Sequence, residues 1–143
     1  MTRNVIITVT GTHETDGVRQ DPVVTTASGR HFVQNGKHYL LYDELPDRAD
    51  GVVQNIVKFN GQILEVTKKG ALESRMTFEK GKMNVTHYKT PAGILELGMT
   101  AKEIVLTESR ARVEIRVDYE LHAGGRKVQD STVIISAVQQ PIV

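Results

Sequence analysis

Apolar and charged side chains alternate without a break from Arg112 to Leu121, near the C-terminal end of the chain. The residues of the apolar set are Val113, Ile115, Val117, Tyr119 and Leu121. An α-helix would scatter these residues around its circumference, whereas a β-strand places every second residue on one face. The pattern therefore predicts a strand with one buried face and one face in water, which is typical of an antiparallel sheet.

Turn signals recur along the chain and divide it into short segments. They fall at Asp16–Gly17, Asn35–Gly36, Asp50–Gly51, Asn60–Gly61, Lys80–Gly81, Pro91–Gly93 and Gly124–Gly125. Glycine supplies the positive φ angles of tight hairpins because it has no Cβ. Val, Ile and Thr together contribute 42 residues against 17 for Leu and Ala, a composition that favours strands. We therefore expect a single all-β domain over residues 1–143, an antiparallel barrel of about 8–10 strands that is closed or nearly closed.

Two hairpins and two irregular positions can be expected within this barrel. The hairpins pair Val52–Phe59 with Ile63–Lys68 and Lys82–Thr90 with Ile94–Met99. Gly98 and Gly29 lie inside long strand-like stretches, where a glycine often marks a bulge or a bend. Closing the sheet would remove its exposed edges, so a barrel is favoured over an open sheet.

Charge and composition exclude several classes of protein. The formal net charge is +1, which rules out a globally basic nucleic-acid binder. The chain has no cysteine, so disulfides, thiolate-bound metals and a thiol nucleophile are excluded. The N-terminal apolar stretch is too short and too interrupted for a signal peptide, and no run is long enough for a membrane helix. We therefore expect a cytoplasmic protein.

Five segments along the chain form a familiar set: Asn35–Glu44, Lys69–Ala71, Arg75–Gly81, His87–Leu97 and Val117–Leu121. Together they resemble the YwiB-like family of small bacterial proteins, a domain family of unknown function. The resemblance extends over nearly the whole chain in the same order and turn spacing. It implies a calycin-like, lipocalin-related β-barrel from the bacterial cytosol. It implies no established activity, ligand or catalytic residue.

Five residues are candidates for contacts with a ligand. They are Tyr39, Tyr42, Arg75, His87 and Tyr88. Tyrosines inside a barrel can line a cavity with an apolar ring and a polar tip, although they pack equally well as core residues. Tyr39 and Tyr42 have opposite parity, so at most one of them faces the interior of a regular strand. His87 has the parity of Met83 and Val85, which predicts that it points inward.

Each charged candidate also has an ordinary structural interpretation. Arg75 could bind an anion, but a cross-strand ion pair with Glu73, Glu79 or Glu96 is favoured. An inward His87 could titrate or contact a ligand, but a core histidine bonded to a neighbour is favoured. The remaining histidines (His13, His31, His38 and His122) show no metal-ligand spacing and are interpreted as surface or rim residues.

No catalytic or cofactor motif is visible, so neither an enzyme nor a cofactor is predicted. Two functions remain open. The first is binding of a small apolar or amphipathic molecule inside the barrel. The second is a non-enzymatic structural or interaction protein whose barrel is filled by side chains and which forms a homodimer or docks a protein partner. Binding of single-stranded nucleic acid by the slightly basic segment from Lys58 to Lys102 is a weaker alternative.

Overall fold

The computed structural model describes residues 2–45, 51–71, 73–90 and 92–140, with the side chains of residues 88–90 left aside. The described residues form β-strands and turns and contain no helix. The strands are β1 (Arg3–Thr15), β2 (Val18–Arg19), β3 (Val23–Gln34), β4 (Lys37–Glu44), β5 (Val53–Phe59), β6 (Ile63–Gly70), β7 (Ser74–Glu79), β8 (Met83–Thr90), β9 (Gly93–Glu108), β10 (Arg112–Ala123) and β11 (Arg126–Gln139).

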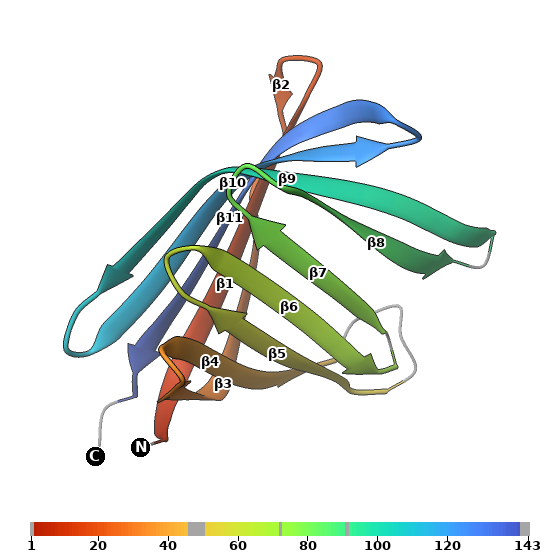
Figure 1. Ribbon diagram of the computed structural model, residues 1–143. Helices are drawn as coiled ribbons and strands as arrows, with labels where there is room; N and C mark the ends of the chain where they lie inside the picture. The colour runs from red at the N-terminus through yellow and green to blue at the C-terminus, as the bar shows by residue number, and fades with distance from the viewer. Residues whose placement is uncertain (1, 46–50, 72, 91, 141–143) are drawn as a thin grey trace.

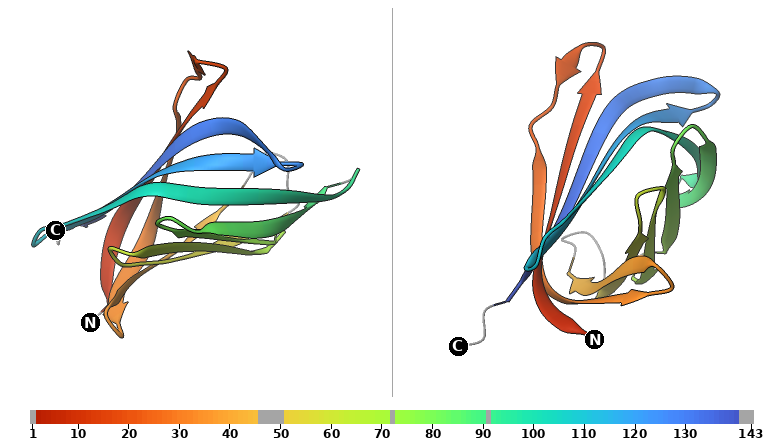
Figure 2. Two further views of the ribbon diagram at one scale, coloured as in Figure 1. Left: turned by 45° about the horizontal axis from the view of Figure 1, so that its top comes forward. Right: turned by 60° about the vertical axis from the view of Figure 1, so that its left-hand side comes forward.

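These strands form one antiparallel sheet in the order β7-β6-β5-β4-β3-β1-β11-β10-β9-β8, with the two-residue β2 paired to β1. The sheet curls until its two edge strands, β7 and β8, approach each other (Figures 1 and 2). Both expected hairpins are present, since β5 pairs with β6 and β8 pairs with β9. The prediction of a nearly closed antiparallel barrel is therefore confirmed.

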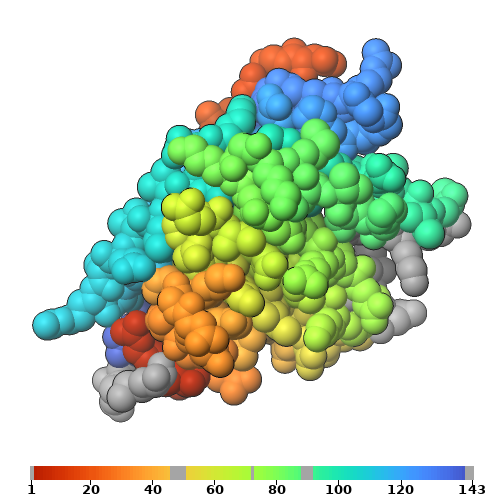
Figure 3. Space-filling view, viewed as in Figure 1, coloured from red at the N-terminus to blue at the C-terminus, as the bar shows by residue number. Residues whose placement is uncertain are grey.

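The barrel closes through a short seam between β7 and β8. Glu79 bridges Lys82 at the turn that joins the two strands, and the amide of Gly81 donates to the carbonyl oxygen of Ala101 at 3.0 Å. Farther along, the hydroxyl of Thr86 donates to the carbonyl oxygen of Arg75 at 2.7 Å. A side chain thus replaces part of the ladder of backbone hydrogen bonds that is missing between β7 and β8. The space-filling view shows these two strands packed against each other (Figure 3).

The core lies inside the barrel and follows the alternation of the strands. The predicted inward set of β10 is confirmed: Val113, Ile115, Val117 and Tyr119 are buried, and Leu121 packs beside them. Other strands contribute further large side chains that are shielded from water, among them Ile7, Leu40, Phe59, Leu64 and Met99. These residues fill the middle of the barrel with side chains.

The two glycines expected at irregular positions have different roles from each other. At Gly29 a Cβ would lie 2.5 Å from both the carbonyl oxygen of Leu41 and Cδ1 of Ile7. Gly29 is therefore required where β1, β3 and β4 come together. Gly98 is not a bulge, because the register of β9 shifts instead at Lys102. Gly98 lies under the side chain of Met83, whose Sδ would be 3.1 Å from an added Cβ.

This crowding leads to a prediction about stability. The substitution Gly29→Ala is expected to lower the free energy of unfolding by about 3 kcal/mol, the upper part of the range for overpacked sites. The reason is that the backbone oxygen of Leu41 cannot move aside as a flexible side chain would. Urea denaturation measures the loss. Gly61→Ala is the matched control, because an added Cβ at Gly61 meets nothing within 4 Å. Equal stability of the two variants would contradict the prediction.

Candidate functional site

The four predicted site residues whose side chains the structure describes do not come together. Tyr39 lies on the outer face of β4, where its ring stacks on Phe32 at 4.8 Å and Lys58 lies 5.5 Å from its centre. Tyr42 faces the core instead, which agrees with the expectation that only one of the two tyrosines does so. Burial, together with the charge of Glu44, raises the pKa of Tyr42 to about 12.

The predicted inward orientation of His87 is wrong. Its side chain is 64% exposed on the outer face of β8 and lies 3.4 Å from Glu96. Met83 and Val85, which share its parity, are also exposed. Thr86 points inward instead, and its hydroxyl donates a hydrogen bond to the carbonyl oxygen of Arg75 across the seam. Met83 packs over Gly98 on the outer surface, so its apolar character does not mark the inner face.

Of the other two candidates, only Arg75 has a described side chain. Arg75 forms a cross-strand ion pair at 3.3 Å, as favoured, but its partner is Glu65 rather than one of the three carboxylates named from sequence. The side chain of Tyr88 lies outside the described part of the structure. A role in ligand contact stays a prediction for all five residues.

A different set of polar residues meets at one end of the barrel. We call this end the β9–β10 mouth: it lies where the β3–β4, β5–β6 and β9–β10 turns gather, at the lower left of Figure 1 near both termini. Four side chains form a polar row across it, namely Arg3, His31, His38 and Glu108. They come from β1, β3, β4 and β9, so the row joins walls that are not neighbours in the sheet.

The register of the strands explains how the row is assembled. Arg3 is opposite His31 in the β1–β3 ladder, and His38 is opposite Val33 in the next ladder. The four residues share the inward parity of the buried side chains on their strands. Glu108, the last residue of β9, contacts His38 from a strand that is not a neighbour of β4 in the sheet. The row is therefore a product of barrel closure.

The three contacts of the row run in one direction. Nη2 of Arg3 is 3.4 Å from Nδ1 of His31, Nε2 of His31 is 2.8 Å from Nδ1 of His38, and Nε2 of His38 is 2.8 Å from Glu108. A guanidinium can only donate, so Nδ1 of His31 accepts and its Nε2 carries the hydrogen. His31 then donates to His38, which donates to the carboxylate of Glu108. Every ring nitrogen has a partner with one hydrogen on each ring.

Packing fixes the two imidazole rings in this arrangement. Their planes are within 17° of each other, and the His38 ring stacks on Phe59 with 5.1 Å between centres. His31 is only 3% exposed. Burial, with the nearby His38 and the positive charge of Arg3, lowers the pKa of His31 to about 4. The ring is therefore neutral near pH 7, as the direction of the hydrogen bonds requires.

A cavity of about 170 Å³ opens beside the polar row. All four residues of the row line it, together with apolar residues of β1, β3, β10 and β11. Two of the five N–H groups of the Arg3 guanidinium donate to described partners. One donates to His31 and one to the carbonyl oxygen of Arg110 at 3.2 Å. Within the described residues, no carboxylate pairs with it. The cavity therefore combines donor groups of a cation with an apolar wall.

The opposite end of the barrel carries an internally satisfied polar cluster. Nζ of Lys68 is 2.6 Å from Oε1 of Glu44 and 2.7 Å from Oδ1 of Asn55, and the amide of Asn55 donates to Glu44 at 3.0 Å. Burial alone would raise the pKa of Glu44, but the hydrogen bonds from Lys68 and Asn55 outweigh it and lower the pKa. Within this cluster the ammonium group of Lys68 is paired with the carboxylate of Glu44.

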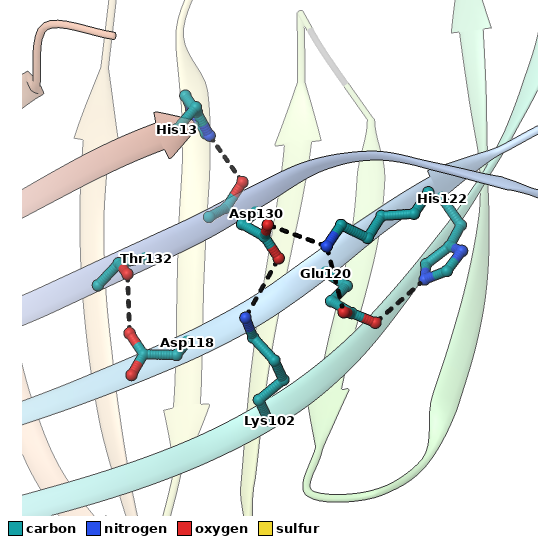
Figure 4. Close-up of polar contacts among 9 residues, drawn as sticks. His13, Lys102, Asp118, Glu120, His122, Asp130 and Thr132 are labelled. Atoms are coloured by element: carbon teal, nitrogen blue, oxygen red, sulfur yellow. Dashed lines mark hydrogen bonds and ion pairs between the residues drawn. The ribbon is translucent and has the colours of Figure 1, made fainter. Parts of the chain in front are cut away.

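A third polar region lies on the outside of the sheet, over β9, β10 and β11 (Figure 4). Asp130 contacts Lys102 at 3.2 Å and Lys127 at 3.0 Å, while Lys127 also reaches Glu120 at 3.6 Å. The hydrogen bonds from Lys127 and Lys102 lower the pKa of Asp130. A hollow of about 470 Å³ adjoins this network. The charges of Lys102, Lys127, Glu120 and Asp130 compensate one another on an exposed face, where such pairs contribute little to stability.

Sequence reasoning missed all four residues of the row: Arg3 and Glu108 were not singled out, and His31 and His38 were interpreted as surface or rim histidines. One signal was present: His38 has the parity of Leu40 and Tyr42 within the same strand. That parity places His38 inside but does not name its partner. The contact with Glu108 joins residues 70 positions apart and could not be read from local spacing. Among the described residues, no three His, Asp or Glu side chains are placed to share a metal ion.

Comparison with known proteins places the fold among related chains. The family model described as "Domain of unknown function (DUF1934)" matches residues 7–135. The crystal structure of the ywiB protein from Bacillus subtilis has a TM-score of 0.84 and 25% identity, over 98% of this chain and 94% of that chain. This confirms the resemblance found in the sequence. The search of curated proteins gives no match, and no helix in the described parts of the chain could cross a membrane.

Proposed function

The chain belongs to the DUF1934 family, a domain family of unknown function, and we propose that this member binds a small carboxylic acid at its β9–β10 mouth. The ligand would have one carboxylate and a short aliphatic chain, and binding would involve no reaction. The site would operate in the bacterial cytoplasm. The observation that carries the proposal is the guanidinium of Arg3, which faces the cavity with unused donors and no described carboxylate partner.

The charge of the site favours a singly charged acid. A guanidinium forms strong, directed hydrogen bonds with a carboxylate. Glu108 also lines the cavity, and its negative charge would repel a ligand with two or more charges. His31 and His38 present no free N–H donor to a ligand in the cavity, because the N–H of His31 donates to His38 and that of His38 donates to Glu108. Arg3 is therefore the group that would hold the acid.

The apolar wall favours an aliphatic body on that acid. Val5, Val33, Val113 and Ala137 line the cavity together with the polar row. A volume of about 170 Å³ is below the range of about 300–1,000 Å³ found for drug-sized ligands. The ligand is therefore of the size of a short-chain fatty acid. Its amphipathic character agrees with one of the two functions expected from sequence.

The location differs from the expected one, because the middle of the barrel is occupied. Leu40, Phe59, Leu64, Met99 and Ile115 meet there from different walls and are fully shielded from water. A ligand inside the barrel would have to displace this core. The mouth offers space without that cost. The hydroxyl of Ser109 at the cavity rim donates to the carbonyl oxygen of Arg112 at 3.3 Å rather than to a base, which supports binding without catalysis.

Isothermal titration calorimetry with butyrate tests the proposal. We expect saturable binding of one butyrate per chain with a Kd of about 1 mM or below, a modest affinity suited to so few atoms. Arg3→Met keeps the length of the side chain but removes its charge, and should weaken binding at least about tenfold. Arg126→Met removes an arginine from the start of β11, which lies far from the mouth, and should leave the affinity unchanged.

Two further ligands separate the possible sources of binding. Butanamide has nearly the shape of butyrate without its charge and should bind much more weakly. Inorganic phosphate carries more charge and no aliphatic chain, so it should also bind weakly. Butyrate binding that survives Arg3→Met, or phosphate binding that exceeds butyrate binding, would refute the proposed ligand class.

A further inference from the structure

One nitrogen of the polar row has only a weak hydrogen bond. Nδ1 of His31 accepts from Nη2 of Arg3 over 3.4 Å, which is long for a hydrogen bond, whereas each of the other two contacts of the row is 2.8 Å long. Arg3 and His31 both line the cavity. A ligand held by the Arg3 guanidinium would therefore lie beside this nitrogen.

A carboxylate on Arg3 would meet a second acceptor at Nδ1 of His31. In the neutral ring this nitrogen carries a lone pair, and a carboxylate oxygen can only accept. The two atoms repel each other unless a hydrogen lies between them. A proton on Nδ1 would supply that hydrogen and form a charge-assisted hydrogen bond with the ligand. Because Nε2 of His31 already donates to His38, the rest of the row would keep its hydrogen bonds.

The charges around the two imidazole rings also favour a proton once an acid is bound. The charged or titratable groups that face the rings are Arg3 of β1 and Glu108 of β9, one at each end of the row. Arg112 of β10 also lines the cavity, but its guanidinium is paired with Glu114 at 2.5 Å. Since Arg3 and Glu108 carry opposite charges, the anion of an acid would leave the mouth with one excess negative charge. One proton on the imidazole rings restores the balance.

We propose that His31 is a second ligand-binding group, which takes up a solvent proton when a carboxylate binds to Arg3 and passes the positive charge along the row to His38. This role depends on the binding of an acid at the mouth that we propose as the function. One N–H bond forms at Nδ1 of His31. The hydrogen on Nε2 of His31 then moves to Nδ1 of His38, 2.8 Å away. His31 ends neutral with its hydrogen toward the ligand, and His38 ends as an imidazolium.

The surroundings of His38 suit a positive charge better than those of His31. Nε2 of His38 donates to the exposed carboxylate of Glu108 over 2.8 Å, so an imidazolium there forms an ion pair. The ring also stacks on Phe59, and the face of an aromatic ring attracts a cation. His31 is buried beside a guanidinium, and burial together with His38 and Arg3 lowers its pKa to about 4. The row is therefore a path by which the charge leaves the buried ring.

Calorimetric titration of the full chain with butyrate near pH 6, in PIPES and in Bis-Tris, tests this role. Butyrate is ionised at that pH, and the two buffers release a proton with different heats. The heats of binding should differ by the equivalent of about half a proton or more per butyrate, because a carboxylate in contact raises the pKa of an imidazole. Binding should also be about twofold tighter, or more, near pH 6 than near pH 7.5, since the proton is taken up on binding.

Two variants identify the group that takes up the proton. His31→Gln should bind butyrate without proton uptake and with the same affinity at both pH values. His122→Gln changes a histidine of the outer polar network, which contacts Glu120, and should keep both effects (Figure 4). Circular dichroism checks that both variants are folded. Proton uptake that persists in His31→Gln assigns the proton to another group and overturns the proposal.

Imidazole ¹⁵N resonances of the wild-type chain give a second readout that needs no variant. At saturating butyrate near pH 6, the nitrogens of His38 should shift toward imidazolium values, and His31 should carry its hydrogen on Nδ1. Bound butyrate with two neutral rings, or with equal heats in the two buffers, overturns the role of His31 and leaves the proposed function standing. Absence of any saturable butyrate binding refutes the proposed function, and the role of His31 with it.

Discussion

Replacing Phe59 with alanine is expected to lower the free energy of unfolding by about 3–5 kcal/mol, the usual range for a buried phenylalanine. Phe59 is fully shielded from water at the end of β5, and its ring stacks on His38. The substitution would leave a cavity in the core and remove the surface that fixes the His38 ring. We therefore expect both a loss of stability and a weaker hold on the polar row.

Urea denaturation at neutral pH measures the first effect, and the histidine side-chain resonances in NMR spectra report the second. Val105→Ala is a suitable control, because Val105 is exposed on β9 and its truncation should change stability by less than about 0.5 kcal/mol. A loss below about 1 kcal/mol in Phe59→Ala would show that this part of the barrel is not packed as described.

Acid is expected to destabilise the barrel through His31. Its pKa is about 4 in the folded chain and 6.5 in the unfolded chain, so the unfolded state binds the proton more readily. Stability from this residue is complete above pH 6.5 and is lost as the pH falls toward 4. A difference of this size corresponds to about 3 kcal/mol. The groups that face His31 are Arg3 and His38, with Glu108 beyond, and a proton on Nδ1 of His31 would oppose the N–H groups of Arg3.

Comparison of two variants across this pH range isolates the effect. His31→Gln removes the titrating ring and should flatten the dependence of unfolding free energy on pH between 6.5 and 4. His87→Gln removes an exposed histidine and should retain the wild-type dependence. If both variants keep the wild-type slope, His31 is not the residue that responds to acid, and its ring is not held neutral by its surroundings.

The strands were predictable because their signal is local. Alternation in β10 fixed its buried face, and the turn residues fixed two hairpins. The same reasoning failed for β8. Its apolar residues Met83 and Val85 were predicted to point inward, but both are exposed. The contacts that decide which residues of β8 point inward are non-local. The hydroxyl of Thr86 donates to the carbonyl oxygen of Arg75 across the seam, and Met83 packs over Gly98 on the next strand.

The candidate site was not predictable for a related reason. Its residues lie on four strands and meet only when the barrel closes. No spacing between residues in the sequence therefore predicts that they come together. Local chemistry could place His38 inward, but only the far wall supplies Glu108. Aromatic and charged residues on single strands, such as Tyr39 and Arg75, were easier to notice and are paired with ordinary neighbours.

The most direct test of this account is an NMR titration of the ¹⁵N-labelled full chain with butyrate. The account predicts saturable shifts of backbone amides around the β9–β10 mouth, at residues 3–5, 31–33, 108–113 and 137–139. Changes in the imidazole resonances of His31 should accompany them. Shifts centred on the Glu44–Lys68 cluster or on the outer network around Asp130, or no saturable shift at all, would contradict the claim that the mouth is a binding site.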